Sequence, residues 1–144
     1  MIQIPKRYDS EFLDVEAAVL DLLRGPVGEC SPEGSVVTAL PADADKALQS
    51  GAFFVLATRV GGGVPPDQRA RDTASVAVSV LSPRRSDSWS VAGMVRAVFD
   101  EHQPGQFGVA EVSEMTGPVQ SPFASPDRRM VTLYFNVTVM KRRR

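Results

Sequence analysis

Two segments of the chain alternate between apolar residues and mostly polar ones, and they restrict the possible folds more than any other feature. In residues 131–139 every odd position is Val, Leu or Phe, while Thr, Tyr or Asn occupies the positions between them. Residues 73–81 repeat the pattern, with Val76, Val78 and Val80 in phase. A period of two places successive side chains on opposite faces of a strand. Both segments are therefore predicted to be strands of a sheet with one apolar face.

Two other segments have the 3.6-residue period of an amphipathic helix, residues 9–23 and 86–100. We expect Asp9 to cap the first helix, and Gly25 and Pro26 to end it. The apolar positions of the first segment are Phe12, Val15, Val19, Leu22 and Leu23, and those of the second are Val91, Ala92, Val95, Val98 and Phe99.

The remaining segments predict shorter elements around these four. Residues 52–60 are a continuous apolar run of strand length, which is typical of a strand buried on both faces. Weaker patterns predict strands at 35–40 and 107–115 and a helical turn within 42–50. Two segments rich in Gly, Pro or Ser predict loops at 61–71 and 117–127. Strands outnumber helices, which favours an α+β fold: one domain, 1–144, with a mixed or antiparallel central sheet flanked by two main helices. Residues 141–144 are expected to form a flexible basic tail.

Charge and cysteine content exclude several classes of protein. The chain has 144 residues and a formal net charge of -1, which gives no general attraction to nucleic acid or to an anionic membrane. All 17 acidic residues lie within 1–127, whereas every charged residue of 128–144 is basic. One cysteine excludes an internal disulfide. The chain has neither an apolar signal segment nor the ~20 apolar residues that span a bilayer, so we expect synthesis in a cytoplasm and no membrane partner.

The residue patterns of enzymes, metal sites and cofactor sites are missing from the sequence. The one histidine, His102, has no recognisable nucleophile or orienting carboxylate, and Cys30 has no catalytic partner. The spacings of common zinc and calcium motifs are absent. The Gly61–Gly63 cluster lacks the Lys-Ser/Thr that follows in a phosphate-binding loop. We therefore expect no catalytic, metal or cofactor residues and no enzymatic activity.

Several ordered pieces of the chain resemble the tail terminator proteins of long-tailed phages, especially those that infect actinobacteria. The pieces are an opening helix with Asp14-Val15-Glu16, a strand ending in Thr58-Arg59-Val60-Gly61-Gly62, a helix with Trp89 and Arg96, the pair Gly117-Pro118, and the last strand Tyr134-Phe135-Asn136-Val137. The resemblance implies a structural virion protein at the tail-neck junction. Six copies would form a ring that caps the tail tube, ends its polymerisation and joins a head-completion protein, while genomic DNA passes through the lumen without sequence-specific binding.

The resemblance also suggests where subunits meet each other or the tube. A terminator needs two different faces, and loops that become ordered on docking can provide them. The candidates are the first loop with its flanking residues, the start of the first helix, and the second loop: Arg59, Gly61, Gly62, Gly63, Asp67, Arg69 and Arg71; Asp14 and Glu16; Gly117, Pro118 and Asp127. Arg59 is expected to pair with Asp14 or Glu16 across a subunit boundary, and charge reversal there to weaken assembly of a folded monomer.

Three other functions remain open at this point. A head-closure or connector protein of the neck would share the ring but bind on the portal side. A small α+β ligand-binding or enzymatic domain would use residues 61–71 as a lid over a pocket. A DNA-packaging accessory protein would use the basic residues 141–144 for salt-dependent contact with the duplex.

Overall fold

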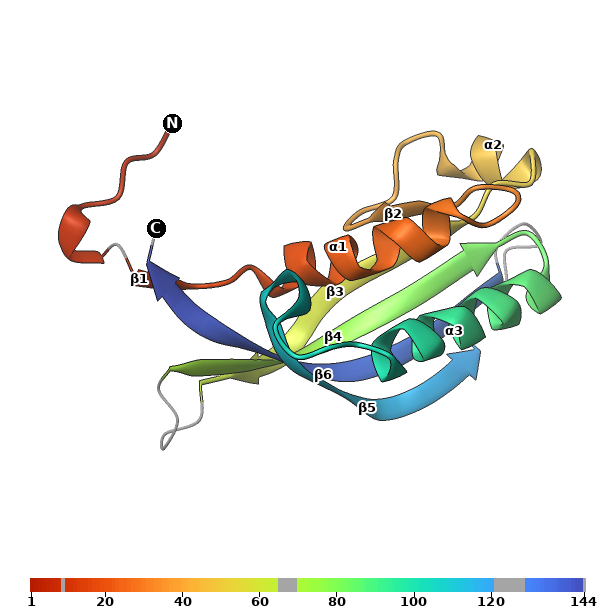
Figure 1. Cartoon of the computed structure of the whole chain (residues 1–144). Coiled ribbons are helices and arrows are strands. Elements are labelled where there is room, and N and C mark those ends of the chain that lie inside the picture. Colours follow the sequence, from red (N-terminus) through yellow and green to blue (C-terminus); the bar gives the residue numbers. More distant parts are fainter. Residues whose placement is uncertain (9, 65–69, 121–128, 144) are drawn as a thin grey trace.

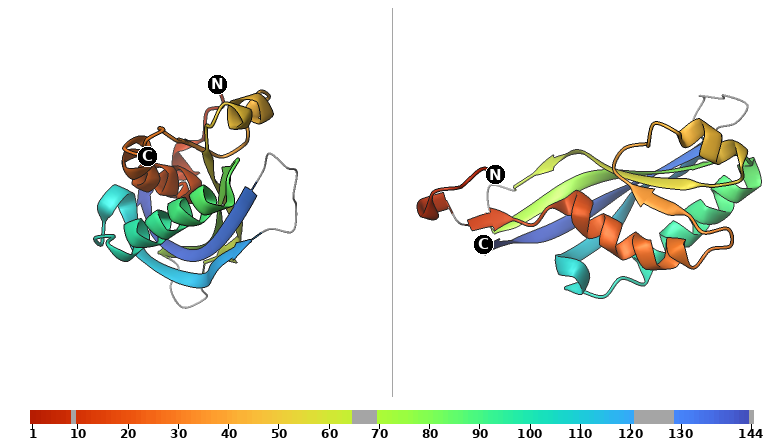
Figure 2. Two further views of the ribbon diagram at one scale, coloured as in Figure 1. Left: turned by 90° about the vertical axis from the view of Figure 1, so that its right-hand side faces the viewer. Right: turned by 90° about the horizontal axis from the view of Figure 1, so that it is seen from above.

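A single twisted sheet carries two long helices on one face (Figures 1 and 2). The computed structural model describes residues 1–8, 10–64, 70–120 and 129–143. The helices are α1 (Val15–Gly28), α2 (Ala44–Gln49) and α3 (Arg85–Asp100), with short 3-10 turns η1 (Lys6–Tyr8) and η2 (Gln106–Gly108). The strands are β1 (Ser10–Phe12), β2 (Ser35–Val37), β3 (Phe54–Gly63), β4 (Arg71–Ser82), β5 (Val109–Gln120) and β6 (Arg129–Arg143).

The sheet is mixed, and its strand order is β1-β6-β4-β3-β2, with β5 paired to β6. Only the β2–β3 pair is parallel, and the other described pairs are antiparallel. β5 and β1 occupy successive stretches of the same edge of β6, because Val109 is opposite Val139 and Phe12 is opposite Lys141. The predicted α+β class with a mixed sheet is confirmed.

The core lies between the sheet and the two long helices. Alternate residues of β4 and β6 point toward the helices, and they are completely or almost completely buried. Phe99 of α3 packs against Phe135 of β6 with ring centroids 4.3 Å apart. Burying apolar area in this way supplies the main favourable term of folding, at about 25 cal/mol per Å². The core residues of the two central strands are Ala74, Val76, Val78 and Val80, and Val131, Leu133, Phe135, Val137 and Val139.

The opposite face of the sheet is covered at one corner, where α2 packs Ala44 and Leu48 against Phe54 and Leu81. On this face β4 and β6 are joined by hydrogen bonds between small polar side chains. They connect Ser79 to Thr132 (3.0 Å), Ser75 to Asn136 (3.4 Å) and Thr73 to Thr138 (3.0 Å). The alternation in the sequence therefore predicted both faces of these strands correctly.

The ends of α1 differ from the prediction. The helix is capped by Asp14, whose Oδ1 accepts a hydrogen bond from the backbone N–H of Ala17 at 3.3 Å, and not by Asp9, which lies outside the described residues. Pro26 lies inside the last turn and does not end the helix. A proline in the last turn removes the hydrogen bond that its N–H would donate to the carbonyl four residues earlier, and the helix ends two residues later at Gly28.

Three predicted loops or tails are strand in the structure. β3 runs through Gly61, Gly62 and Gly63, and β4 begins at Arg71, so most of the described part of the first loop is a hairpin. β5 includes Gly117 and Pro118. Residues 141–143, expected to be a flexible tail, continue β6 and pair with β1, which was not predicted. Pairing with a partner strand overrides weak local propensity in each case.

Candidate functional site

One end of the sheet extends beyond the helices, and we call it the sheet tip (Figure 1). It includes the end of β3 and the start of β4, with the residue next to each, that is, residues 59–64 and 70–73. It also includes residues 140–143 of β6 and the strand β1 that pairs with β6. The backbone N–H of Lys141 donates to the carbonyl of Ala70 at 2.9 Å, which ties β6 to the start of β4. The tip is thus a paired sheet projecting from the body.

The glycines allow the β3 side of the tip to follow its partner strand. The register between β3 and β4 shifts between Arg59 and Gly61, so Val60 is the extra residue of a β-bulge. Gly62 has φ +90°, and a Cβ there would collide with the carbonyl oxygen of Thr73. Bulges turn side chains in new directions and favour glycine nearby. Val60 is consequently 55% exposed.

A bidentate ion pair joins β3 to β4 at the base of the tip. Arg59 Nη1 and Nη2 donate to Asp72 Oδ2 and Oδ1 at 2.6 and 2.8 Å. Asp72 is buried, at 4% exposure. The hydrogen bonds to Asp72 raise the pKa of Arg59; burial opposes this, and the charges of Asp72 and Glu16 add to it. Glu16 of α1 therefore lies close enough to act on the same guanidinium.

The predicted site residues fall into two groups at opposite ends of the strands. Near the tip lie those at the start of α1, in the hairpin and at Arg71, whose Nη1 is 3.9 Å from Glu111 Oε1. Gly117 and Pro118 lie at the far end of β5, close to Gln120, which accepts a hydrogen bond from Arg85 Nε at 3.3 Å. Asp67, Arg69 and Asp127 lie outside the described residues.

Arg59 has a partner within its own chain that the sequence analysis missed. Asp72 is in phase with the buried residues Ala74 and Val76, which places its carboxylate on the helix-covered face. The sequence alone shows that Asp72 shares the buried phase of β4, and a buried carboxylate needs a positively charged partner. Identifying that partner as Arg59 required the pairing of β3 with β4. The predicted pairing of Arg59 with Asp14 or Glu16 across a subunit boundary stays a prediction.

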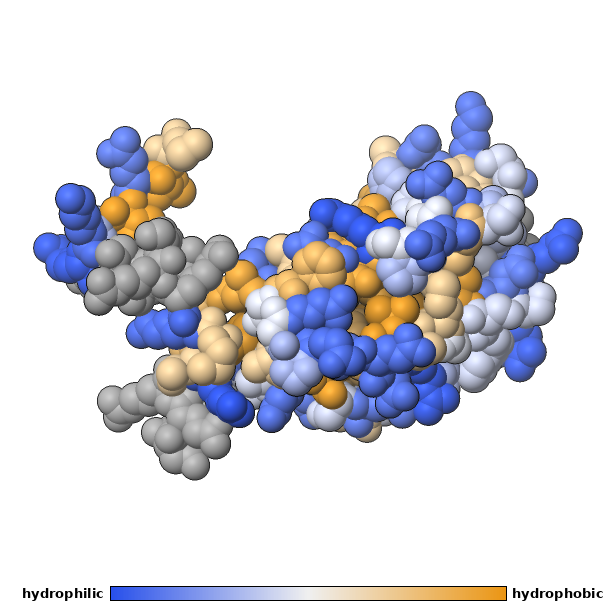
Figure 3. Space-filling model, viewed as in Figure 1, coloured by the Kyte–Doolittle hydropathy of each residue, from blue (hydrophilic) through white to orange (hydrophobic). Residues whose placement is uncertain are grey.

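Large apolar side chains are exposed at the tip and on the N-terminal segment. At the tip Val60, Val64 and Met140 are 55%, 43% and 42% exposed. The space-filling view shows further hydrophobic surface on the segment before β1, which stands away from the body (Figure 3). Concentrated apolar surface on a folded protein is typical of an interaction site.

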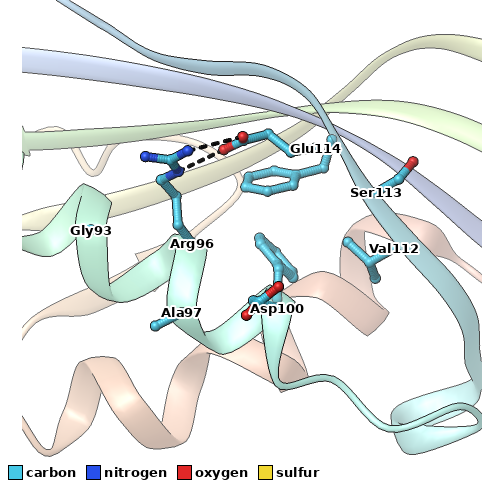
Figure 4. Close-up of a pocket in the computed structure, with 9 residues that line it drawn as sticks. Gly93, Arg96, Ala97, Asp100, Val112, Ser113 and Glu114 are labelled. Carbon is cyan, nitrogen blue, oxygen red and sulfur yellow. Dashed lines mark hydrogen bonds and ion pairs between the residues drawn. The ribbon is translucent and has the colours of Figure 1, made fainter.

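A groove of about 490 Å³ lies between α3 and β5 (Figure 4). It is hollow because Gly93 and Ala97, one helical turn apart, carry small side chains. Arg96 Nε and Nη2 donate to Glu114 Oε1 and Oε2 at 2.7 and 3.0 Å across it. These bonds raise the pKa of Arg96. The lining also includes the aromatic pair of the core, Phe99 and Phe135, with Asp100, Val112 and Ser113.

The described residues include no cluster of three or more His, Cys, Asp or Glu side chains that could hold a metal ion. Among the described helices none has the length and apolar character needed to cross a bilayer. The Cys30 thiol donates to the carbonyl of Pro26 at 3.6 Å, and burial raises its pKa, helped by the charge of Glu29. A raised pKa keeps the thiol protonated and unreactive.

Comparison with known protein families matches residues 11–144 to the phage tail termination proteins. A search of curated proteins finds no match. The family match covers nearly the whole chain, from within β1 to the end of β6. It agrees with the resemblance seen in the sequence and implies a place in the virion tail and contact with other tail components. The chain therefore belongs to the phage tail termination protein family.

Proposed function

We propose that six copies of this chain form a ring that caps the tail tube, ends its polymerisation and joins the tail to a head-completion protein. Family membership supports the terminator role. The two unlike ends of the subunit support contact with different partners on the two sides of the ring. The single observation on which the proposal depends most is the sheet tip, which projects beyond the helices and exposes Val60, Val64 and Met140.

The tip is suited to contact with a neighbouring subunit or with the tube. Val60 and Met140 belong to strands of the paired sheet, so their backbone loses little conformational entropy when the side chains become buried. Arg71 and Lys141 lie beside them and offer positive charge. The start of α1 offers the acidic residues Asp14 and Glu16 near the base of the tip. A contact between the tip of one copy and a different surface of the next would be heterologous, the kind that closes a ring.

The far end of the subunit offers a different surface, as termination requires. It is formed by α2, the start of α3 and residues 117–120 of β5. A surface unlike the tip would not accept a further tube subunit in the same way, so that polymerisation stops. We assign this end, with Gly117 and Pro118, to the head-completion protein.

The sheet face opposite the long helices suits the lumen. Between residues 73–79 of β4 and 132–138 of β6 its side chains are uncharged and mostly hydroxyl-bearing or amide-bearing. Binding of DNA to proteins depends mainly on cations that neutralise phosphates. A face without such cations would allow the genome to pass without holding it.

The test is the native mass by light scattering over a range of concentrations, with negative-stain imaging of mixtures with purified tail tubes. Rings, or density at tube ends with arrested growth, are the expected result. Binding to a portal-side neck protein with no effect on tube ends would overturn the terminator role and favour the connector alternative. A monomer that ignores both would overturn the ring as well.

A further inference from the structure

We propose that residues 1–7 are an exchange arm whose apolar side chains dock into the α3 groove of a neighbouring copy. The inference rests on the proposed function, because it requires copies to associate, and it names one contact between them. The arm precedes the part of the chain that matches the family, which begins at residue 11.

The arm exposes more apolar surface than any similar length of the described chain. Met1, Ile2 and Ile4 are 121%, 86% and 47% exposed, and the segment stands clear of the body (Figures 1 and 3). Ile4 precedes Pro5, which disfavours helix at Ile4. In extended backbone Ile2 and Ile4 are two residues apart and therefore point to the same side. Together they form an apolar edge that the described residues of the same chain leave exposed.

The α3 groove offers a partly apolar lining with a carboxylate beside it. Its lining includes Val112 and the rings of Phe99 and Phe135, and small residues of α3 leave it open. The carboxylate of Asp100 lies in the lining and is exposed. Phe99 and Phe135 are themselves almost fully buried, so Ile2 and Ile4 would seat mainly against Val112 beside them. Lys6 follows the apolar edge of the arm, and this placement brings its ammonium group toward Asp100.

The register of the sheet directs the arm toward another copy. β1 and β5 run in the same direction along one edge of β6, with Ser10 opposite Arg143 and Val112 opposite Val137. The chain before β1 therefore leaves past the end of β6, away from the groove of its own subunit. One surface of each copy would meet a different surface of the next, which is a heterologous contact.

Cross-linking between differently marked copies tests the contact. Both proteins carry Cys30→Ser, which removes the one natural thiol. One also carries Ile4→Cys, and the other carries Gly93→Cys, a groove position where a Cβ meets nothing within 4 Å. The matched control is Gly25→Cys in α1, a helical glycine that is equally open. After mixing, with and without tail tubes, and mild oxidation, we expect several-fold more disulfide dimer with Gly93→Cys than with Gly25→Cys, because a disulfide requires close approach of the two backbones.

The outcomes separate the arm from the proposed function. Rings or capped tubes that give no more dimer at Gly93 than at Gly25 overturn the arm and leave the terminator role intact. Copies that never associate, alone or on tubes, overturn both. A chain carrying both Ile4→Cys and Gly93→Cys that closes on itself at high dilution overturns the choice of a neighbour. As a second readout, Ile2→Asp added to the Ile4→Cys protein is expected to reduce the cross-linked fraction several-fold. In the chain without added cysteines, Ile2→Asp with Ile4→Asp is expected to reduce the assembled fraction several-fold without changing the melting temperature of the monomer.

Discussion

Arg59 and Asp72 form a bidentate ion pair, at 2.6 and 2.8 Å, between neighbouring strands at the base of the sheet tip. The two side chains are unequal, because that of Asp72 is 6% exposed and that of Arg59 is 34% exposed. Removing Arg59 and removing Asp72 should therefore cost different amounts of folding free energy, because an unpaired charge is tolerated better where water can reach it. The pair ties β3 to β4 at the base of the tip.

We expect Arg59→Met to destabilise the monomer more than Asp72→Asn does. The first leaves a buried carboxylate without a partner and should cost about 2–4 kcal/mol, below the upper end for fully buried pairs because Arg59 is partly solvated. The second leaves a cation that can turn to water and should cost about 1–2 kcal/mol. Urea denaturation gives both values. Combining Arg59→Met with Asp72→Leu should recover part of the loss, and equal costs for the two single variants would contradict this assignment.

The same pair changes how Arg59 can be tested in assembly. Charge reversal at Arg59, suggested by the sequence alone, would place a second carboxylate beside Asp72. The monomer would lose stability together with any interface, so the expectation of an intact monomer is not supported by the observed geometry. Exposed residues of the tip are better positions for such a test.

We expect Gly62→Ala to cost at least about 1–3 kcal/mol, because its φ of +90° is strained for an L-residue and its Cβ would meet the Thr73 carbonyl. Gly63→Ala is the matched control, since a Cβ there meets nothing within 4 Å. It should change the free energy of unfolding by less than about 0.5 kcal/mol. Thermal and urea unfolding of the two variants would measure the difference. Similar stabilities would mean that the bulge does not need a left-handed residue at position 62.

The Cys30 thiol should resist alkylation up to alkaline pH. Its Sγ is 3.6 Å from the carbonyl oxygen of Pro26 and 3.7 Å from Met94 Sδ, and burial, then the charge of Glu29, raises its pKa. A pKa that is higher in the folded state adds stability that is fully present below the unfolded pKa and is lost as pH rises through the folded pKa. Iodoacetamide rates against pH should therefore have a higher midpoint in the folded protein than in urea. A lower or equal midpoint would refute the assignment, and Cys30→Ala should remove the associated alkaline loss of stability.

The sequence alone predicted the parts of the fold that depend on periodicity. Alternation in residues 73–81 and 131–139 identified both central strands and their buried faces, and the 3.6-residue pattern identified α3 within one residue at its start. Strand ends were predicted less well, because the continuation of β6 through residues 141–143 depends on β1, a partner distant in the sequence. A pairing partner of that kind leaves no local pattern.

The sequence selected several residues that the structure places at one end of the sheet, and their role in contacts between subunits stays a prediction. Arg59 and the glycines were chosen from a family resemblance and a loop composition, and they do lie together at the tip. Their local roles follow from the register: Arg59 lies opposite Val76, and Asp72 is in phase with Val76, so both side chains are on the helix-covered face. The exposure of Val60 likewise could not be inferred from an apolar run that looks buried.

Val60→Lys is expected to leave the monomer folded and to weaken assembly. Val60 is 55% exposed, so the free energy of unfolding should change by less than about 0.5 kcal/mol, while a desolvated ammonium in a tip interface would cost far more. The matched control is Val119→Lys, an equally apolar side chain that is 51% exposed on β5 at the far end of the sheet. Tube capping counted in negative-stain images should fall at least tenfold for Val60→Lys, which corresponds to about 1.4 kcal/mol. Because Val119 lies near the end assigned to the head-completion protein, Val119→Lys should cap tubes normally. Equal capping by both variants would show that the tip does not contact the tube, and loss of capping by Val119→Lys alone would reverse the assignment of the two ends.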